Sequence, residues 1–250
     1  MSKYSGFVFD IDKTAVPNGA LTVESEALKD AFAALPEEVI AIAATGRSLE
    51  FALPITQALN LKHESVVANG ALIVDSQTGA SSWERLLSAS QVASILEVCR
   101  PHDYGLYLSG DEPGSIRAAS EQSVRITAAA FLTKVPAKVA HDVHAQILEI
   151  PGVSAYLSPA WGGAEDTFDI NMGNIEAKKH NALNVLYGKY AINASKMIGV
   201  GDGLNDLELF EAVGYKIAVA NAHPLLIEQA DEVVSSQEDD GLAEVVRRFL

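Results

Sequence analysis

The sequence has a single cysteine, Cys99, among its 250 residues, so no disulfide can form within the chain. A chain without disulfides suits a reducing compartment, and we expect a cytoplasmic protein. The first residues, "MSKYSGF", contain no apolar signal core, and no apolar run approaches the roughly 18 residues that a membrane-spanning helix needs. We therefore expect neither a secretory leader nor a membrane partner.

Basic residues are also scarce. The chain has 18 Lys and Arg against 33 Asp and Glu, a formal net charge of -15. Such a balance argues against a phosphate-backbone partner and thus against nucleic acid. It does not exclude a small anionic substrate, because a bound metal can reverse the field at one site. The length suits one large domain, or a domain carrying an insert.

Apolar strand-like runs alternate with helical patterns at both ends of the chain. Strands are expected at 6–11, 39–47, 65–74 (two strands around an Asn-Gly turn), 196–203, 216–220 and 232–236. Helices are expected at 23–35 (with Thr22 as N-cap), 48–59, 176–188, around 204–213 and at 241–250. This alternation predicts an α/β fold with a parallel sheet and right-handed crossovers. Asp10, Thr45 and Asp202 each follow an apolar run, so we expect them at the carboxyl edge, where such sheets bind ligands.

The middle of the chain, about 80–167, has a different pattern. Helices at 89–99 and 138–150 alternate with strand-like runs at 104–110, 124–131 and 153–158. The polar, Gly-containing stretches "SQTGASS" and "SPAWGGAED" set this part off from the rest. We expect a small α+β domain inserted into the first.

The stretch "FVFDIDKT" ends a buried strand with two carboxylates, Asp10 and Asp12. Positions i and i+2 of a strand point to the same face, so the two acids repel unless they share a cation or a proton. Mg²⁺ would resolve this, since hard cations take oxygen ligands. A carboxylate can also attack phosphorus to form an aspartyl-phosphate. The alternative is simply that the strand ends in polar residues.

Three further motifs could complete such a site. In "ATGRS", Thr45 and the amides around Gly46 could bind phosphate at a helix start, and Arg47 could bind an oxyanion or hold the turn. An ordinary helix N-terminus is the alternative. In "GVGDGLNDLELF", two acids, Asp202 and Asp206, flank a tight turn and favour a cation, although the glycines could be purely structural.

The third motif is the pair Lys178 and Lys179 at a predicted helix start. A cation there opposes the helix dipole, so another group should hold it, unless the lysine is simply solvated. Together the motifs supply a nucleophile, a proton carrier, a phosphate-binding hydroxyl, a cation and a second group of acids. These are the groups that an enzyme of phosphoryl transfer needs.

The ordered motifs "DIDKT", "ATGR", "KHNAL" and "GDGLND" resemble those of the haloacid dehalogenase-like superfamily. The resemblance is to its subfamily IIB, or Cof-type, branch, which includes sugar phosphatases, sucrose-phosphate phosphatase and archaeal phosphoglycolate phosphatase. The stretches "ANGALI", "ANAHP" and "EDDGLAEVV" also resemble that branch. The resemblance implies a Rossmann-like catalytic core at 1–79 and 168–250, with an inserted α+β cap domain at 80–167.

The resemblance also implies residue roles. Asp10 would be the nucleophile and a Mg²⁺ ligand, and Asp12 would carry the leaving-group proton and ligate the metal through its carbonyl. Lys179, which fits the family spacing better than Lys178, would neutralise charge between Asp10 and phosphate. The remaining implied groups are phosphate-binding Thr45, Gly46, Arg47, Asn69 and Asn205, and metal-binding Asp202 and Asp206.

We therefore expect an enzyme: a Mg²⁺-dependent phosphatase for a small phosphorylated metabolite, a sugar phosphate or a phosphoglycolate-like acid, working as a monomer or homodimer. Two alternatives stay open, a phosphomutase of the same superfamily and a non-catalytic binding protein on this fold. The chain departs from the branch at Lys13, where glycine is usual. Lys13 could contact the substrate or the cap domain, or point into solvent.

Overall fold

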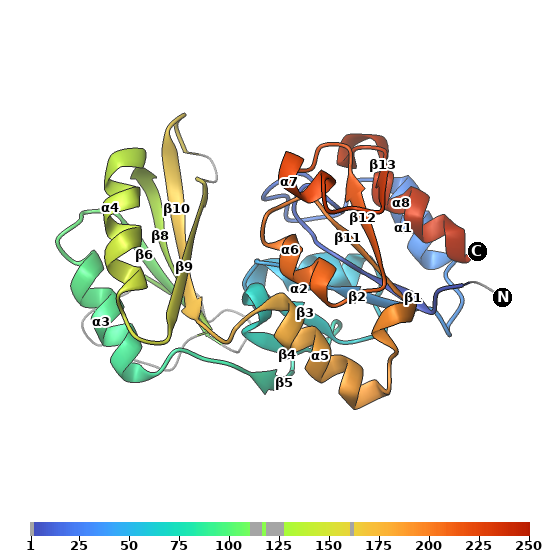
Figure 1. Ribbon diagram of the computed structural model, residues 1–250, viewed down its shortest axis with the longest axis horizontal. Coiled ribbons are helices and arrows are strands. Elements are labelled where there is room, and N and C mark those ends of the chain that lie inside the picture. The colour runs from blue at the N-terminus through green and yellow to red at the C-terminus, as the bar shows by residue number, and fades with distance from the viewer. Residues whose placement is uncertain (1–2, 111–116, 119–127, 161–162) are drawn as a thin grey trace.

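The computed structural model describes residues 3–110, 117–118, 128–160 and 163–250. It is an α/β structure in which a five-stranded parallel sheet lies at one end and a five-stranded antiparallel sheet at the other (Figure 1). This confirms the expected fold class, a Rossmann-like parallel sheet core with an inserted α+β cap domain. No helix in these ranges is both long and apolar enough to cross a membrane.

The core sheet has the strand order β13-β12-β11-β1-β2, and every neighbouring pair is parallel. Its strands are β1 (Gly6–Phe9), β2 (Ile40–Ala43), β11 (Met197–Gly201), β12 (Tyr215–Val219) and β13 (Glu232–Val234). β1 lies between β2 and β11, with Phe9 level with Ala43 and Val200. The carboxyl ends of these three strands therefore meet at one edge.

Alternation along β1 sends successive side chains to opposite faces of the core sheet. Phe7 and Phe9 pack with Phe32 of α1 (Glu26–Ala33) and, for Phe7, with Phe249 near the C-terminus. On the other face α6 (Asp206–Glu211) lies close against Gly199, where an added Cβ would meet Leu209 at 2.5 Å. Asp10, the next residue after Phe9, falls on the α6 side.

The other helices are α2 (Leu49–Ala58), α5 (Lys179–Tyr190), α7 (Pro224–Ile227) and α8 (Gly241–Val246), with short 3-10 turns at Ala194–Lys196, Gln237–Asp239 and Arg247–Phe249. α1 begins later than expected. Ser25, not Thr22, is its N-cap, because the Ser25 hydroxyl accepts a hydrogen bond from the amide of Leu28.

A three-stranded antiparallel sheet extends the core beside β2. It contains β3 (Ser65–Val67), β4 (Leu72–Val74) and β5 (Ser81–Glu84), with the 3-10 turn Ala68–Gly70 between the first two. The strand–turn–strand expected at 65–74 is thus confirmed, whereas β5 had no counterpart in the sequence-based expectation. A parallel bridge between Ala44 and Val66 joins this sheet to β2.

Within the residues that the structure describes, the cap domain contains a five-stranded antiparallel sheet with the order β7-β6-β8-β10-β9 and two helices. Its elements are α3 (Ala89–Cys99), β6 (Gly105–Ser109), β7 (Arg117–Ala118), β8 (Ala129–Pro136), α4 (Ala137–Leu148), β9 (Val153–Pro159) and β10 (Thr167–Asn174). A second apolar cluster, separate from that of the core, fills the space between the helices and the sheet. In Figure 1, α3 and α4 lie on the outer side of this sheet and the core lies on its other side.

Hydrogen bonding suggests where the chain crosses between the two domains. β5 pairs with β4 of the core, and β10 pairs with β8 and β9 of the cap domain. We therefore propose to move the expected boundaries, 79/80 and 167/168, to the connections that follow β5 and β10. Strand β10 had no counterpart in the sequence-based expectation.

Gly70 is a position where the backbone demands glycine. Its φ is +99°, and an added Cβ would lie 2.3 Å from the backbone of Lys178 at the start of α5. We expect Gly70→Ala to lower the free energy of unfolding by about 2–4 kcal/mol, because strain and overlap add. Urea denaturation would measure this.

Gly188 provides the matched control, since it lies exposed in α5 with nothing within 4 Å of an added Cβ. Gly188→Ala should raise the free energy of unfolding by roughly 0.5–1 kcal/mol through helix propensity. Equal effects at the two glycines would contradict the assigned geometry.

Candidate active site

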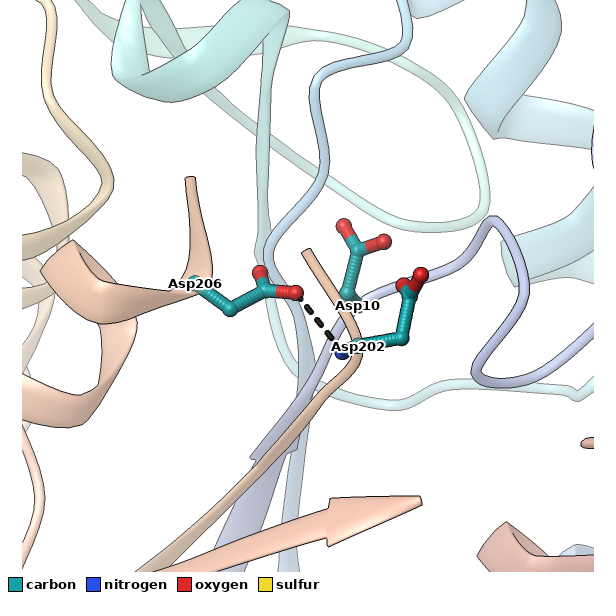
Figure 2. Close-up of side chains that lie close together, drawn as sticks. All are labelled: Asp10, Asp202 and Asp206. Carbon is teal, nitrogen blue, oxygen red and sulfur yellow. Dashed lines mark hydrogen bonds between the residues drawn. The ribbon is translucent and has the colours of Figure 1, made fainter. Parts of the chain in front are cut away.

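Three carboxylates from two strand ends and a helix start converge at the carboxyl edge of the core sheet. Asp10 follows β1, Asp202 follows β11, and Asp206 begins α6. One oxygen from each lies within 4.8 Å of the others (Figure 2). Asp10 and Asp206 are buried, and Asp202 is half-buried. The structure therefore brings together three of the acids singled out in the sequence.

Lys179 is fully buried and lies between two of these acids. Its Nζ is 2.7 Å from Oδ1 of Asp10 and 2.6 Å from Oδ1 of Asp206. Lys179 is the first residue of α5, and its own amide donates to the carboxylate of Glu208 at 3.1 Å. These acids offset the unfavourable position of a cation at a helix N-terminus.

The charges shift the pKa values of the cluster in a consistent way. Burial raises the pKa of Asp10 well above its ordinary value, with Lys179 opposing the rise. Burial and the neighbouring charge of Asp206 raise the pKa of Asp202 to about 7. Burial alone would lower the pKa of Lys179, but Asp10 and Asp206 outweigh it and raise that pKa. Lys179 is therefore charged, and Asp10 and Asp202 hold their protons more tightly than isolated carboxylates do.

The carboxylate of Asp206 organises its own loop. Its Oδ2 accepts hydrogen bonds of 2.9 Å from the amides of Asp202 and Gly203, while Oδ1 accepts from Lys179. Figure 2 shows the bond to Asp202. Asp206 thus fixes where Asp202 lies, and Thr14 adds a hydrogen bond of 3.2 Å to Oδ1 of Asp202.

Asp12 and Arg47 form an ion pair with two hydrogen bonds. Arg47 donates through Nε to Oδ2 of Asp12 at 2.8 Å and through Nη2 to Oδ1 at 2.7 Å, while the amide of Gly19 donates to Oδ1 at 2.8 Å. The remaining nitrogen of Arg47 donates to the carbonyls of Ala20 and Phe51. In this arrangement Arg47 holds the Asp12 carboxylate, and its guanidinium is already occupied, so nothing marks it as a phosphate contact.

The residues expected to bind phosphate lie around the end of β2. Thr45 is buried, and its hydroxyl oxygen accepts from the amide of Arg47 at 3.1 Å, which leaves its proton free to donate. Gly46 lies against Asn69, with 3.0 Å between an added Cβ and Asn69 Oδ1. Asn205 donates to that same oxygen at 3.5 Å, so the side chains of two loops meet here.

Sequence reasoning missed two residues near the cluster. Glu208, which binds the amide of Lys179, occupies the first turn of α6, where an acid favours the helix dipole, and this was the available signal. Tyr156 of β9 lies close enough for the charges of Lys179, Asp10 and Glu208 to act on its hydroxyl. No sequence pattern links a cap-domain strand to the core in this way.

The cluster suits a hard divalent cation. The atoms available as metal ligands are all oxygens. Among the described residues no group donates a hydrogen bond to Oδ2 of Asp10 or to Oδ2 of Asp202. Hard divalent cations such as Mg²⁺ bind where several carboxylate oxygens lie close together and few positively charged side chains neutralise them. Both oxygens of Asp206 already accept hydrogen bonds, which suits a residue that orients the ligands.

Comparisons with known proteins identify the family of the chain. The model of the haloacid dehalogenase-like hydrolase family matches residues 7–147 and 160–246. A phosphoglycolate phosphatase of Methanothermobacter thermautotrophicus is 29% identical over 241 residues, 96% of each chain. One from Staphylothermus marinus is 24% identical over 97% of this chain and 96% of its own.

Solved structures share the whole fold. A haloacid dehalogenase-like hydrolase from Bacteroides thetaiotaomicron has a TM-score of 0.80 at 18% identity, covering 99% of this chain and 100% of its own. A subclass IIB sugar phosphatase has a TM-score of 0.75 at 16% identity, covering 98% of each chain. With the family model spanning both ends of the chain, this protein belongs to the haloacid dehalogenase-like hydrolases and is a phosphatase of that family.

Proposed function

We propose that the protein hydrolyses the phosphate monoester of a small metabolite through an aspartyl-phosphate on Asp10, with Mg²⁺ as its cofactor. The observation that carries the proposal is the position of Asp10. Its carboxylate is buried at a strand end, 2.7 Å from the Lys179 ammonium and within reach of two further acids. A carboxylate so placed is held still and is stabilised in its ionised form by Lys179.

In the first step a free oxygen of Asp10 attacks phosphorus, and the bond from phosphorus to the ester oxygen breaks. Lys179 stays on Asp10 and offsets the negative charge that the phosphoryl group brings. The hydroxyl of Thr45 and the side chains of Asn69 and Asn205 line the place where the equatorial oxygens would lie. Their task is to position the group in line with the attack.

Asp12 supplies the proton for the leaving oxygen in this proposal, and then takes one from the water that hydrolyses the aspartyl-phosphate. Arg47 and the amide of Gly19 hold its carboxylate in the present arrangement. We propose Arg47 as a positioning residue that acts through Asp12. This role differs from the direct phosphate contact expected from the motif.

Asp10 and Asp202 would hold the divalent ion, along with the Asp12 carbonyl, and Asp206 would orient Asp202. When bound, the ion neutralises charge on the phosphoryl oxygens and lowers the repulsion between the carboxylates. For the substrate, the relatives' names indicate phosphoglycolate in two archaeal proteins and a sugar phosphate in one solved neighbour. Both classes are small phosphorylated metabolites.

Phosphate release tests the proposal directly. Wild-type protein should release phosphate from acetyl phosphate or a metabolite ester only with Mg²⁺ present, and Asp10→Asn should lower kcat by at least about 10³-fold because the nucleophile is lost. Asp142→Asn, at an exposed position of α4, is the matched control and should behave as wild type. Full activity of Asp10→Asn would refute the proposed mechanism.

The Arg47 contact predicts a second effect. Arg47→Lys keeps the charge but cannot bind both oxygens of Asp12 in a fork. We expect kcat to fall by about 10- to 100-fold with KM little changed, since Asp12 acts on the leaving group after binding. Arg85→Lys, at an exposed arginine directly after β5, serves as control. A rise in KM alone would instead indicate that Arg47 binds substrate.

The raised pKa of Asp202 predicts how stability depends on pH in metal-free protein. Its folded pKa is about 7 against an ordinary 3.8, so between these values the folded state binds more protons than the unfolded state. The contribution to stability is full below pH 3.8 and is lost as pH rises through 7. Chelator-treated protein should therefore unfold at lower urea concentration at pH 8 than at pH 5.

Two additions make this test specific. Asp202→Asn should show a smaller loss between pH 5 and pH 8, whereas Asp142→Asn should keep the wild-type loss. Mg²⁺ should raise the wild-type urea midpoint more at pH 8, where the carboxylates are ionised. An identical pH response in wild type and Asp202→Asn would show that Asp202 does not titrate as described.

A further inference from the structure

The loop that carries Asp12, residues 11–16, closes on itself. The amide of Lys13 donates to the carbonyl of Val16 at 2.7 Å, and the amide of Val16 donates to the carbonyl of Ile11 at 3.0 Å. Lys13 takes a left-handed backbone conformation, with φ of 55°, which is unfavourable for a residue other than glycine. These internal hydrogen bonds shape the loop but do not attach it to the rest of the core.

Asn221 attaches this loop from outside. It lies directly after β12, beyond Ala220, and its side-chain nitrogen donates to the carbonyl of Lys13 at 2.8 Å. Its side-chain oxygen accepts from the amide of Gln237 at 2.7 Å. The first partner can only accept and the second can only donate, so both ends of the carboxamide are in use and its orientation is fixed. Asn221 therefore ties the Asp12 loop to the 3-10 turn that begins at Gln237.

The same segment also holds the second acidic loop. Two residues after Asn221, the amide of His223 donates to the carbonyl of Asp202 at 2.7 Å. The segment 220–223 is thus bonded to the loop of the proposed proton carrier, Asp12, and to the loop of a proposed metal ligand. A brace shared by two loops sets their separation. Such placement matters because a displacement of about 1 Å in an active site can cost about 100-fold in rate.

The exposure of Asn221 separates this role from one in stability. Its side chain is exposed, so water can replace it at both of its partners, and its loss should change stability little. The effect on the loop is different, because Lys13 holds an unfavourable conformation only while its surroundings enforce it. Without the bond to its carbonyl, the backbone of Lys13 can relax, and the adjoining residue Asp12 moves with it.

We propose that Asn221 is a positioning residue for proton transfer: by holding the Lys13 carbonyl, it keeps Asp12 where it can protonate the leaving oxygen. The inference rests on the phosphatase mechanism proposed above and adds to it a residue outside the four motifs. Arg47 and the amide of Gly19 hold the carboxylate of Asp12, and Asn221 holds the backbone beside it. The stretch "ANAHP" thereby has a task in the reaction.

The test compares two esters that differ in their need for a proton. The leaving group of p-nitrophenyl phosphate departs without one, whereas the alkoxide of an alkyl phosphate needs one. The ratio kcat/KM reports the steps up to departure of the leaving group. Asn221→Ala should lower kcat/KM about 10-fold on the alkyl phosphate that wild type hydrolyses best, and less than about 2-fold on p-nitrophenyl phosphate. General damage to the structure would lower both equally.

Two further variants make the test specific. Asn221→Asp keeps an oxygen for the amide of Gln237 but has no donor for the carbonyl of Lys13, so it should show the same selective loss as Asn221→Ala. Its added charge acts on both anionic esters alike. Asn193→Ala is the matched control and should behave as wild type. Asn193 is also exposed and accepts from the amide of Ser195 at 3.0 Å, but it lies before β11, at the opposite edge of the sheet.

Asp12→Asn sets the scale, because it removes the proton carrier itself. It should show a deeper selective loss on the alkyl phosphate, about 100-fold. If it does, while Asn221→Ala lowers both esters equally or neither, or Asn221→Asp behaves as wild type, the positioning role is wrong and the mechanism stands. If Asp12→Asn lowers both esters equally, or wild type hydrolyses neither, the proposed mechanism fails and this inference fails with it.

Discussion

The buried ammonium of Lys179 is the contact on which the site depends. It has no exposed surface, and it bridges Asp10, at the end of β1, and Asp206 on α6. A buried charge is tolerated only when paired, so β1, α5 and α6 must meet in one arrangement. The same bond fixes Asp206, whose other oxygen holds the Asp202 amide. One ammonium therefore positions all three acids.

The remaining imbalance of charge has a functional consequence. Burial, together with the repulsion among the three carboxylates, keeps the pKa values of Asp10 and Asp202 high when no cation is near, and Lys179 only partly opposes the rise. A divalent ion would relieve the repulsion and ionise both groups. Bringing these acids together in the folded state is unfavourable, and packing around β1 offsets that unfavourable free energy. A cation that bound here would remove the repulsion, which would favour its binding.

Much of the core could be predicted from the sequence, because apolar runs that end in Asp10, Thr45 and Asp202 identify both strands and edge. The sequence pattern alone could not tell which of Lys178 and Lys179 belongs to the site, since both lie at the helix start. The spacing in the family motif favoured Lys179. Strand β10 was missed: "TFDINMGN" mixes polar and apolar residues because one face meets helices and the other meets the core. Pairing of Arg47 with Asp12 was missed because it joins residues 35 apart in the chain.

The two domains differ in the chemistry that they bring to their shared space. The core contributes carboxylates, an ammonium and backbone amides, which act on phosphorus whatever the ester. On the cap-domain sheet, strand register aligns Tyr107, Phe131, Asn171 and Tyr156 in one transverse row, and all four side chains are uncharged. A charged side chain in this row would alter the pKa of Asp10 if it lay close to the core cluster, and an uncharged row avoids that effect. Side chains on β9 and β10 can therefore vary without altering the hydrogen bonds of Lys179, whose partners Asp10 and Asp206 both belong to the core.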